Sequence, residues 1–150
     1  ATRLHQLHER ESAADRKENI RRAGESALLL AETGVVVVTA LISPFREDRD
    51  RIAARARERG VAFAEVFVNA PLAECERRDP KSLYRQARAG RIPSFTGIDS
   101  PYEAPLAPDL ELHTDRETPA ASVEKLTRLA LDLVRLEQAQ TGANSAKTRP

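Results

Sequence analysis

The feature that most constrains the fold is an uncharged, β-branched run over residues 35–42, VVVVTALI. Such a run is typical of a strand buried on both faces in a parallel sheet that is covered by helices. Ser43-Pro44 follows it and opens a basic, helix-prone segment, so Ser43 is predicted where the strand ends and a helix begins. Ligands bind at that place in open α/β sheets, and the free N–H groups of a helix start attract anions. The alternative role for Ser43 is only to cap its helix.

The rest of the chain alternates helical and strand patterns. Helices are predicted over residues 1–10, 12–32, 45–59 and 119–140, with strands over 61–69 and 109–113 and a short helix opened by Ala70-Pro71. Short turns between strands and helices predict βαβ units and a parallel sheet. Residues 141–150 carry no apolar pattern and are predicted to form a disordered tail.

Composition narrows the class of protein. A chain of 150 residues with 41% apolar and 31% charged residues is predicted to be one soluble domain. No run approaches the roughly 18 apolar residues of a membrane span, and no signal-peptide pattern opens the chain. Cys75 is the single cysteine, which suits a reducing compartment. His5 and His8 have no third ligand nearby, so no metal ligand is assigned.

Residues 77–102 are the chemically distinctive segment. Six cations fall within residues 77–91 against one acid, Asp79: Arg77, Arg78, Lys81, Arg85, Arg88 and Arg91. Glycine and proline then interrupt any long helix, which suits a mobile lid over a polyanionic ligand. Phe95 and Tyr102 are candidates to stack on a base. RNA binding is the alternative, but aromatic residues are only 4% of the chain, which favours a small nucleotide.

The charged first half of the helix over residues 12–32 allows two interpretations. Arg16, Asn19 and Arg22 follow one another at i, i+3 and i+6 and could face a ligand together. Spacing alone favours a solvated face held by i, i+4 ion pairs.

Five blocks of sequence resemble the adenylylsulfate kinase (APS kinase) family, in order and at the family's spacing. They are DRKENIRR at 15–22, ISPFR at 42–46, EVFVNAP at 65–71, CERRDPK at 75–81 and LYRQARAGRIPSFTGIDSPY at 83–102. The resemblance implies an α/β, three-layer P-loop kinase-like fold over residues 1–140, with a parallel sheet flanked by helices and a lid segment. The implied reaction transfers the γ-phosphate of ATP, with Mg²⁺, to the 3′-hydroxyl of adenosine 5′-phosphosulfate, giving 3′-phosphoadenosine 5′-phosphosulfate in sulfate assimilation.

The resemblance also implies site residues. The family holds its sulfonucleotide at the positions of Arg16, Asn19, Ile42, Ser43, Lys81, Phe95 and Thr96. Phe95 is placed to stack on the substrate adenine, and Thr114 falls near the ATP adenine. Ser43 is the catalytic candidate, because bacterial members carry a phosphoserine there, although direct in-line transfer needs no such intermediate. Implied partners are a second copy of the chain and ATP sulfurylase, as a fused domain or a separate protein. Neither nucleic acid nor membrane is expected, and the implied compartment is the cytoplasm.

Two family motifs do not occur in these 150 residues. One is the phosphate-binding loop G-x-x-x-x-G-K-[ST], whose N–H groups and lysine hold the ATP phosphates. The other is an acidic DGD segment, expected between the first two helices. Either segments are omitted from the sequence, which a Cα–Cα step longer than about 3.8 Å within residues 3–14 would indicate, or the chain is a non-catalytic sulfonucleotide-binding remnant. Omission is favoured, because a buried parallel strand needs a neighbour.

Overall fold

The structure is a computed structural model that describes residues 13–147, with side chains described over 14–135. Its helices are α2 (Ala13–Ala31), α3 (Arg46–Glu58), α4 (Leu72–Arg78), α5 (Leu83–Arg88) and α6 (Pro119–Lys147), and its strands are β1 (Val66–Asn69) and β2 (Leu110–His113). The helix predicted over residues 1–10, His5, His8 and almost all of the segment on which the spacing test rests lie outside the described residues.

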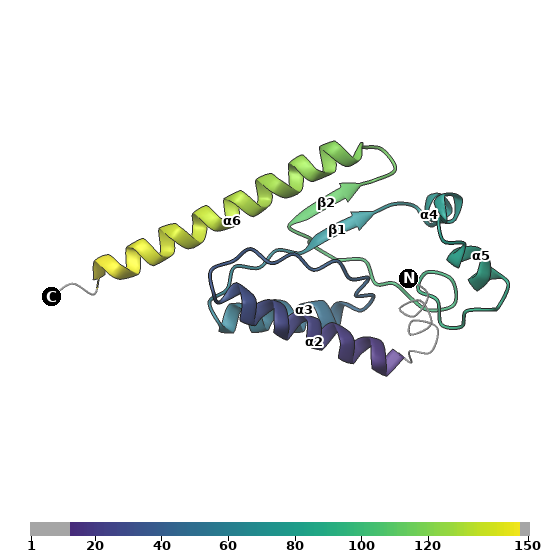
Figure 1. Ribbon diagram of the computed structural model, residues 1–150, viewed down its shortest axis with the longest axis horizontal. Helices are drawn as coiled ribbons and strands as arrows, with labels where there is room; N and C mark the ends of the chain where they lie inside the picture. Colours follow the sequence, from purple (N-terminus) through teal and green to yellow (C-terminus); the bar gives the residue numbers. More distant parts are fainter. Residues whose placement is uncertain (1–12, 148–150) are drawn as a thin grey trace.

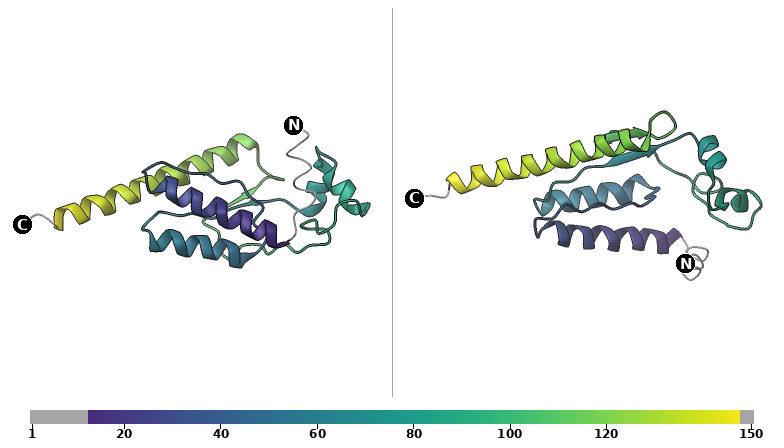
Figure 2. Two further views of the ribbon diagram at one scale, coloured as in Figure 1. Left: turned by 60° about the horizontal axis from the view of Figure 1, so that its bottom comes forward. Right: turned by 45° about the horizontal axis from the view of Figure 1, so that its top comes forward.

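The elements form three layers (Figures 1 and 2). β1 and β2 pair in parallel, in the register Val66↔Leu110 to Asn69↔His113. α6 lies along one face of this sheet, and α3 with α2 lies on the other side. The predicted α/β class with a parallel sheet is therefore confirmed. Among the described residues, no helix is long and apolar enough to span a bilayer.

α2 forms where the sequence predicts a helix, and it packs closely against α3. Leu28 of α2 and Ala56 of α3 are buried between them. Glu25 joins the two helices by ion pairs to Arg55 at 3.2 Å and to Arg59 at 2.6 Å. Gly34, with a φ of +86°, ends the helix as predicted.

The contact at Gly24 leaves no room for a larger residue. A Cβ built on Gly24 would lie 2.3 Å from Cδ1 and 2.8 Å from Cγ1 of Ile52. Gly24→Val is therefore expected to destabilise the fold by about 1–3 kcal/mol, the usual cost of overpacking. Chemical denaturation measures this loss. Adding Ile52→Ala should recover part of the stability, and a double variant no more stable than Gly24→Val would contradict the steric explanation.

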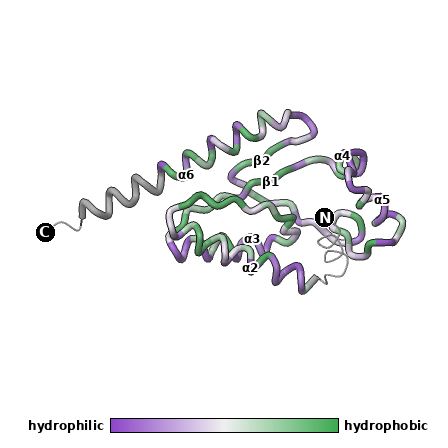
Figure 3. The backbone as a smooth tube through the Cα atoms, viewed as in Figure 1, coloured by the Kyte–Doolittle hydropathy of each residue, from purple (hydrophilic) through white to green (hydrophobic). Residues whose placement is uncertain are grey.

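The prediction of a buried strand over residues 35–42 is wrong for this structure. The run is extended but forms no strand, and Val38 and Ile42 are 72% and 70% exposed. Figure 3 shows it as a hydrophobic trace beside α2 and α3. The physical reason is the lack of a neighbour, since β1 pairs only with β2 within residues 13–147. β-branched residues favour an extended backbone, but a hydrogen-bonded ladder needs a second strand.

The helix start predicted at Ser43-Pro44 also differs from the structure. α3 begins at Arg46 with Phe45 at the N-cap position, where the Phe45 side chain makes no capping hydrogen bond. Ser43 instead has a left-handed backbone with φ +40°. The carboxylate of Glu103, far along the chain, accepts the Arg46 N–H at 2.8 Å. An acid at a helix start satisfies a free N–H and favours the helix dipole, so Glu103 takes the role predicted for Ser43.

The other predicted elements match in place, though not always in length, whereas the short helix α5 was not predicted. β1 begins at Val66 rather than at residue 61, while α4, β2 and α6 begin where the turn signals indicate. α6 contacts β2 and continues to Lys147, so residues 141–147 are helical rather than a disordered tail. A polar composition did not prevent this continuation.

Candidate functional site

The predicted site residues come from elements gathered at one end of the molecule. The carboxyl ends of β1 and β2, the amino ends of α2 and α3, and α4 with α5 all lie toward the right in Figure 1, and the chain then runs back to the amino end of β2. In a parallel sheet this is the end at which ligands bind. The topology therefore brings the elements that carry the candidate residues to one end of the molecule.

The turn at Ser43 is held from α3 and from the end of the lid. Arg49 donates to the Ser43 carbonyl at 2.6 Å and to the Glu103 carbonyl at 2.7 Å. Glu103 N–H donates to the Pro44 carbonyl at 2.8 Å, which closes the arrangement. Ser43 is half-buried, while Ile42 beside it is exposed. Sequence analysis missed both Arg49 and Glu103, because they lie among many charged residues and their contacts are long-range.

Phe95 lies in a tight turn of the lid. The carboxylate of Asp99 accepts the N–H groups of Ser94 and Phe95. The Phe95 carbonyl accepts the Ile98 N–H at 3.0 Å, and Thr96 pairs with Ser100 in a short bridge. The Phe95 ring is half-buried and contacts Tyr84 edge to face, with centroids 5.1 Å apart. Asp99 is a further residue that sequence analysis missed, although its place four residues after Phe95 is a turn signal.

Tyr102, the second stacking candidate, contacts the protein instead. Its ring stacks on Phe67 of β1 with centroids 6.1 Å apart and lies 6.0 Å from the Arg49 guanidinium. Partial burial raises the pKa of the Tyr102 phenol, and the charge of Glu65 adds to the rise while Arg49 opposes it. Tyr102 thus anchors the end of the lid to the sheet, and Phe95 stays the predicted stacking residue.

The basic segment carries less uncompensated charge than the sequence count indicates. Glu74 forms ion pairs with Arg77 at 2.7 Å and Arg78 at 2.6 Å, and Glu76 pairs with Arg88 at 2.6 Å. These acids lie on α4, and both precede the window in which the cations were counted. Of the six cations at residues 77–91, three form no ion pair with the residues described at 14–135: Lys81, Arg85 and Arg91. Lys81, a predicted substrate ligand, is exposed.

The Glu74 ion pairs give a measurable pH effect. Hydrogen bonds from Arg77 and then Arg78 lower the pKa of Glu74 from 4.5 to about 2. A lowered pKa means that these pairs stabilise α4 fully above about pH 4.5 and that their contribution is lost as the pH falls through about 2. NMR titration of the Glu74 carboxyl should show that low midpoint. In Arg77→Gln/Arg78→Gln the midpoint should return toward 4.5, and an unchanged midpoint would contradict this cause.

The polar face of α2 contains the ion pairs of a solvated face, but not all of its polar residues take part in them. Arg22 and Arg21 pair with Glu18 at 2.7 Å, as expected of a solvated face. Arg16 is half-buried and Asn19 is exposed on the first half of the helix. Arg22 is therefore engaged within α2, and Arg16 and Asn19 are the residues of this face that stay predicted as ligands.

Thr114 lies immediately after β2, at the end of the sheet. Its N–H and hydroxyl donate to the Asn69 carbonyl at 2.9 Å and 3.2 Å, and Arg78 donates to its carbonyl at 2.6 Å. Thr114 therefore ties the end of β2 to the end of β1 and to α4. It lies on a different segment from Ser43 and Phe95.

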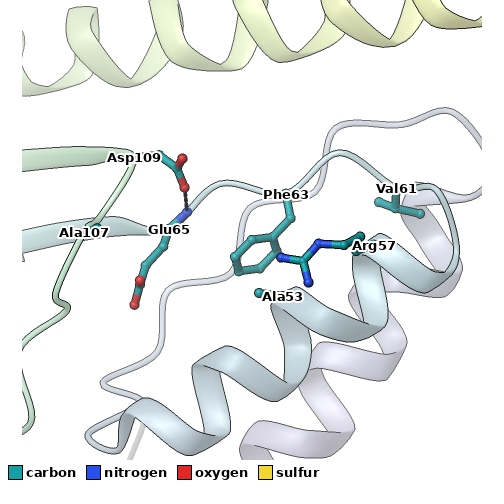
Figure 4. A pocket seen from close by; sticks show the side chains of 7 residues that line it. All are labelled: Ala53, Arg57, Val61, Phe63, Glu65, Ala107 and Asp109. Atoms are coloured by element: carbon teal, nitrogen blue, oxygen red, sulfur yellow. Dashed lines mark hydrogen bonds between the residues drawn. The ribbon is translucent and has the colours of Figure 1, made fainter.

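Two open cavities of the described residues do not include the predicted site residues. One, of about 400 Å³, lies between α3 and the segment leading into β1 (Figure 4). Its lining residues are Ala53, Arg57, Val61, Phe63, Glu65, Ala107 and Asp109. The second, of about 300 Å³, is lined by α5 and Arg91. Asn19, Ser43 and Phe95 line neither, and within residues 14–135 no hydrogen bond joins Ser43 directly to Phe95. Arg49 and Glu103 link the Ser43 turn to the end of the segment that carries Phe95.

Fold and site together define a parallel α/β protein with a lid over the carboxyl end of its sheet, the arrangement of nucleotide kinases. Comparison with known proteins identifies the family. A family model for adenylylsulphate kinase matches residues 5–113. The chain therefore belongs to the adenylylsulphate kinase family, and the predicted P-loop kinase-like fold class is confirmed.

Individual relatives agree with the family. The chain is 51% identical over 121 residues to adenylyl-sulfate kinase of Geotalea daltonii and 52% identical over 122 residues to that of Picosynechococcus sp., covering 81% of this chain in each case. The structure of the Mycobacterium tuberculosis APS kinase CysC in complex with AMPPNP and APS matches 83% of this chain and 69% of its own, with a TM-score of 0.71 and 46% identity. The chain spans 59% and 67% of the two curated relatives.

Proposed function

We propose that this chain is the sulfonucleotide-binding part of an adenylylsulfate kinase. The reaction transfers the γ-phosphate of ATP to the 3′-hydroxyl of adenosine 5′-phosphosulfate and gives 3′-phosphoadenosine 5′-phosphosulfate. The observation that carries the proposal is the fit to a solved APS kinase structure in complex with AMPPNP and APS, at 46% identity over most of this chain. An identity this high supports similarity in the site residues as well as in the fold.

The proposed substrate contacts are the residues predicted from the family blocks. Phe95 stacks on the adenine, and Thr96 follows it in the lid. Lys81, Arg16 and Asn19 supply donors to the phosphosulfate, and Ile42 and Ser43 form the floor at the start of α3. Phosphoryl transfer is mostly a matter of positioning and charge neutralisation, which suits a site of cations and backbone N–H groups. Thr114 is proposed on the side of the ATP adenine.

No residues in this chain are proposed to bind the ATP phosphates or Mg²⁺. The sequence contains no G-x-x-x-x-G-K-[ST] loop. Among the described residues, no three acidic, histidine or cysteine side chains come together in a way that would hold a metal ion. Use of ATP with Mg²⁺ is therefore proposed for the whole protein, and no step of the reaction is assigned to a metal-binding residue of this chain.

One coupled assay tests the function. Intact protein is incubated with ATP, Mg²⁺ and adenosine 5′-phosphosulfate, and ADP release is followed. Release that depends on adenosine 5′-phosphosulfate is expected, and its absence would overturn the kinase proposal. The missing loop motif favours a second candidate, a remnant that binds the sulfonucleotide without turning it over. Calorimetric binding of adenosine 5′-phosphosulfate without ADP release would identify that remnant.

Ser43→Ala tests the covalent role of the serine. Because in-line transfer needs no phosphoserine, we expect the variant to keep turnover within about threefold of the parent in the same assay. Ser43 also has a positive φ, so thermal unfolding should be measured alongside as a control for the fold. Turnover lost with an unchanged unfolding temperature would show that the hydroxyl itself is required.

Partners and compartment complete the proposal. A homodimer is proposed from the family. Association with ATP sulfurylase, fused or separate, is supported by a 55% identical match to the bifunctional enzyme NodQ of Azospirillum brasilense, of which this chain covers 18%. A cytoplasmic location is proposed, consistent with the single, free Cys75.

A further inference from the structure

Arg49, in the first turns of α3, is placed unusually for an arginine. Its side chain is only 12% exposed, in a chain whose other arginines mostly extend over the surface. A guanidinium taken out of water is costly unless its donors are satisfied. The contacts that satisfy it therefore show what the residue holds together.

Its donors go to two other segments, one just before α3 and one far along the chain. One Nη donates to the Ser43 carbonyl at 2.6 Å and the other to the Glu103 carbonyl at 2.7 Å, 54 positions away in sequence. Its Nε lies 2.5 Å from Oε1 of Glu65, a charge contact without the direction of a hydrogen bond. Glu65 is itself only 24% exposed and immediately precedes β1. The planar guanidinium is thus oriented by Glu65 at the start of β1 and contacts the Ser43 and Glu103 carbonyls at the same time.

Both of these segments carry proposed substrate contacts. Ser43 has a positive φ of 40°, a backbone conformation that is unfavourable for a residue other than glycine and needs support from its surroundings. Glu103 lies at the carboxyl-terminal end of the lid segment that contains Phe95, and its carboxylate caps α3 by accepting the Arg46 N–H. Tyr102 beside it stacks on Phe67 below the same guanidinium.

We propose that Arg49 is a positioning residue that sets the Ser43 turn and the anchored end of the lid in one arrangement, so that both meet adenosine 5′-phosphosulfate together. This rests on the proposed function. Arg49 itself contacts no substrate and acts through the two carbonyls. A lysine would keep the positive charge, but a single ammonium on a flexible stem does not reproduce the fork that spans Ser43, Glu103 and Glu65.

The test uses intact protein with Arg49→Lys, and Arg57→Lys as the matched control. Arg57 is exposed in the last turn of the same helix, lining the cavity of Figure 4. In Arg49→Lys the KM for adenosine 5′-phosphosulfate should rise about tenfold, the effect of losing one or two charge-assisted hydrogen bonds, with the KM for ATP changed less than about twofold. Hydrogen exchange should speed up at the amides of Arg46 and Glu103. The control should change neither KM.

Each outcome is decisive. If the parent protein binds no adenosine 5′-phosphosulfate, the proposed function and this inference both fall. If the parent binds it and Arg49→Lys has the same KM and the same exchange rates, only the inference falls. Equal losses for both substrates would indicate a general structural role and would also overturn it. Should Arg49→Lys not fold, Glu65→Gln, which keeps the shape but removes the charge that orients the guanidinium, must show the same selective rise; no rise would overturn the inference.

Discussion

Replacing Phe95 by alanine is expected to raise the KM for adenosine 5′-phosphosulfate by about ten- to a hundredfold. Stacking of a base on an aromatic ring contributes about 1–3 kcal/mol, and each 1.4 kcal/mol corresponds to a tenfold change. The lid turn around Phe95 should survive, because Asp99 holds it through the backbone rather than through the ring. Steady-state kinetics on the intact protein give the measurement.

Two variants separate stacking from packing. Phe63→Ala removes an exposed phenyl ring elsewhere, beside the cavity between α3 and the segment leading into β1, and should leave the KM unchanged. Phe95→Tyr keeps an aromatic face and should retain most of the affinity. If Phe95→Ala instead lowered only the unfolding temperature, the ring would serve the contact with Tyr84 and the stacking role would be wrong.

Replacing Asp99 by alanine is expected to weaken use of adenosine 5′-phosphosulfate by about tenfold without unfolding the sheet. The change removes the acceptor of two backbone N–H groups, at about 1 kcal/mol net for each, and frees the turn that presents Phe95 and Thr96. The KM for adenosine 5′-phosphosulfate and the rate of proteolysis within residues 91–102 are the readouts. Both should rise together.

The matched control for Asp99 is Asp109. Its carboxylate also accepts a backbone N–H, that of Glu65, at 2.7 Å, but it does so at the start of the sheet. Asp109→Ala, which likewise removes an acceptor, should lower stability and leave lid proteolysis unchanged. If both aspartate variants altered the KM equally, the lid turn would not be the specific cause.

Local signals in the sequence predicted much of the fold. α2 is predictable because its apolar stripe ends at Gly34, whose positive φ stops the helix. β1, α4 and β2 follow from turn residues and short apolar runs, and their parallel pairing follows from the helices between them. These features depend on residues close together in sequence.

The failures concern contacts between distant residues. A buried strand was predicted over residues 35–42 because β-branched residues favour an extended backbone. Burial of that backbone in a sheet depends instead on whether a neighbouring strand is present. Glu103 replaces Ser43 as the cap of α3 across more than fifty positions, and no local pattern indicates it. The charge of residues 77–91 was overestimated because Glu74 and Glu76 lie just outside the counted window. Which of Arg16, Asn19, Ser43 and Phe95 bind substrate stays a prediction.

The parallel pairing of β1 with β2 has a consequence for folding kinetics. Glu65 and Asp109 are 44 positions apart, and the ring of chain that their contact closes contains α4, α5 and the whole lid. Closing such a ring carries an entropic penalty that grows with the freedom of the enclosed chain. A small molecule that orders the lid would reduce that freedom, so its presence should slow separation of the two strands even though it touches neither.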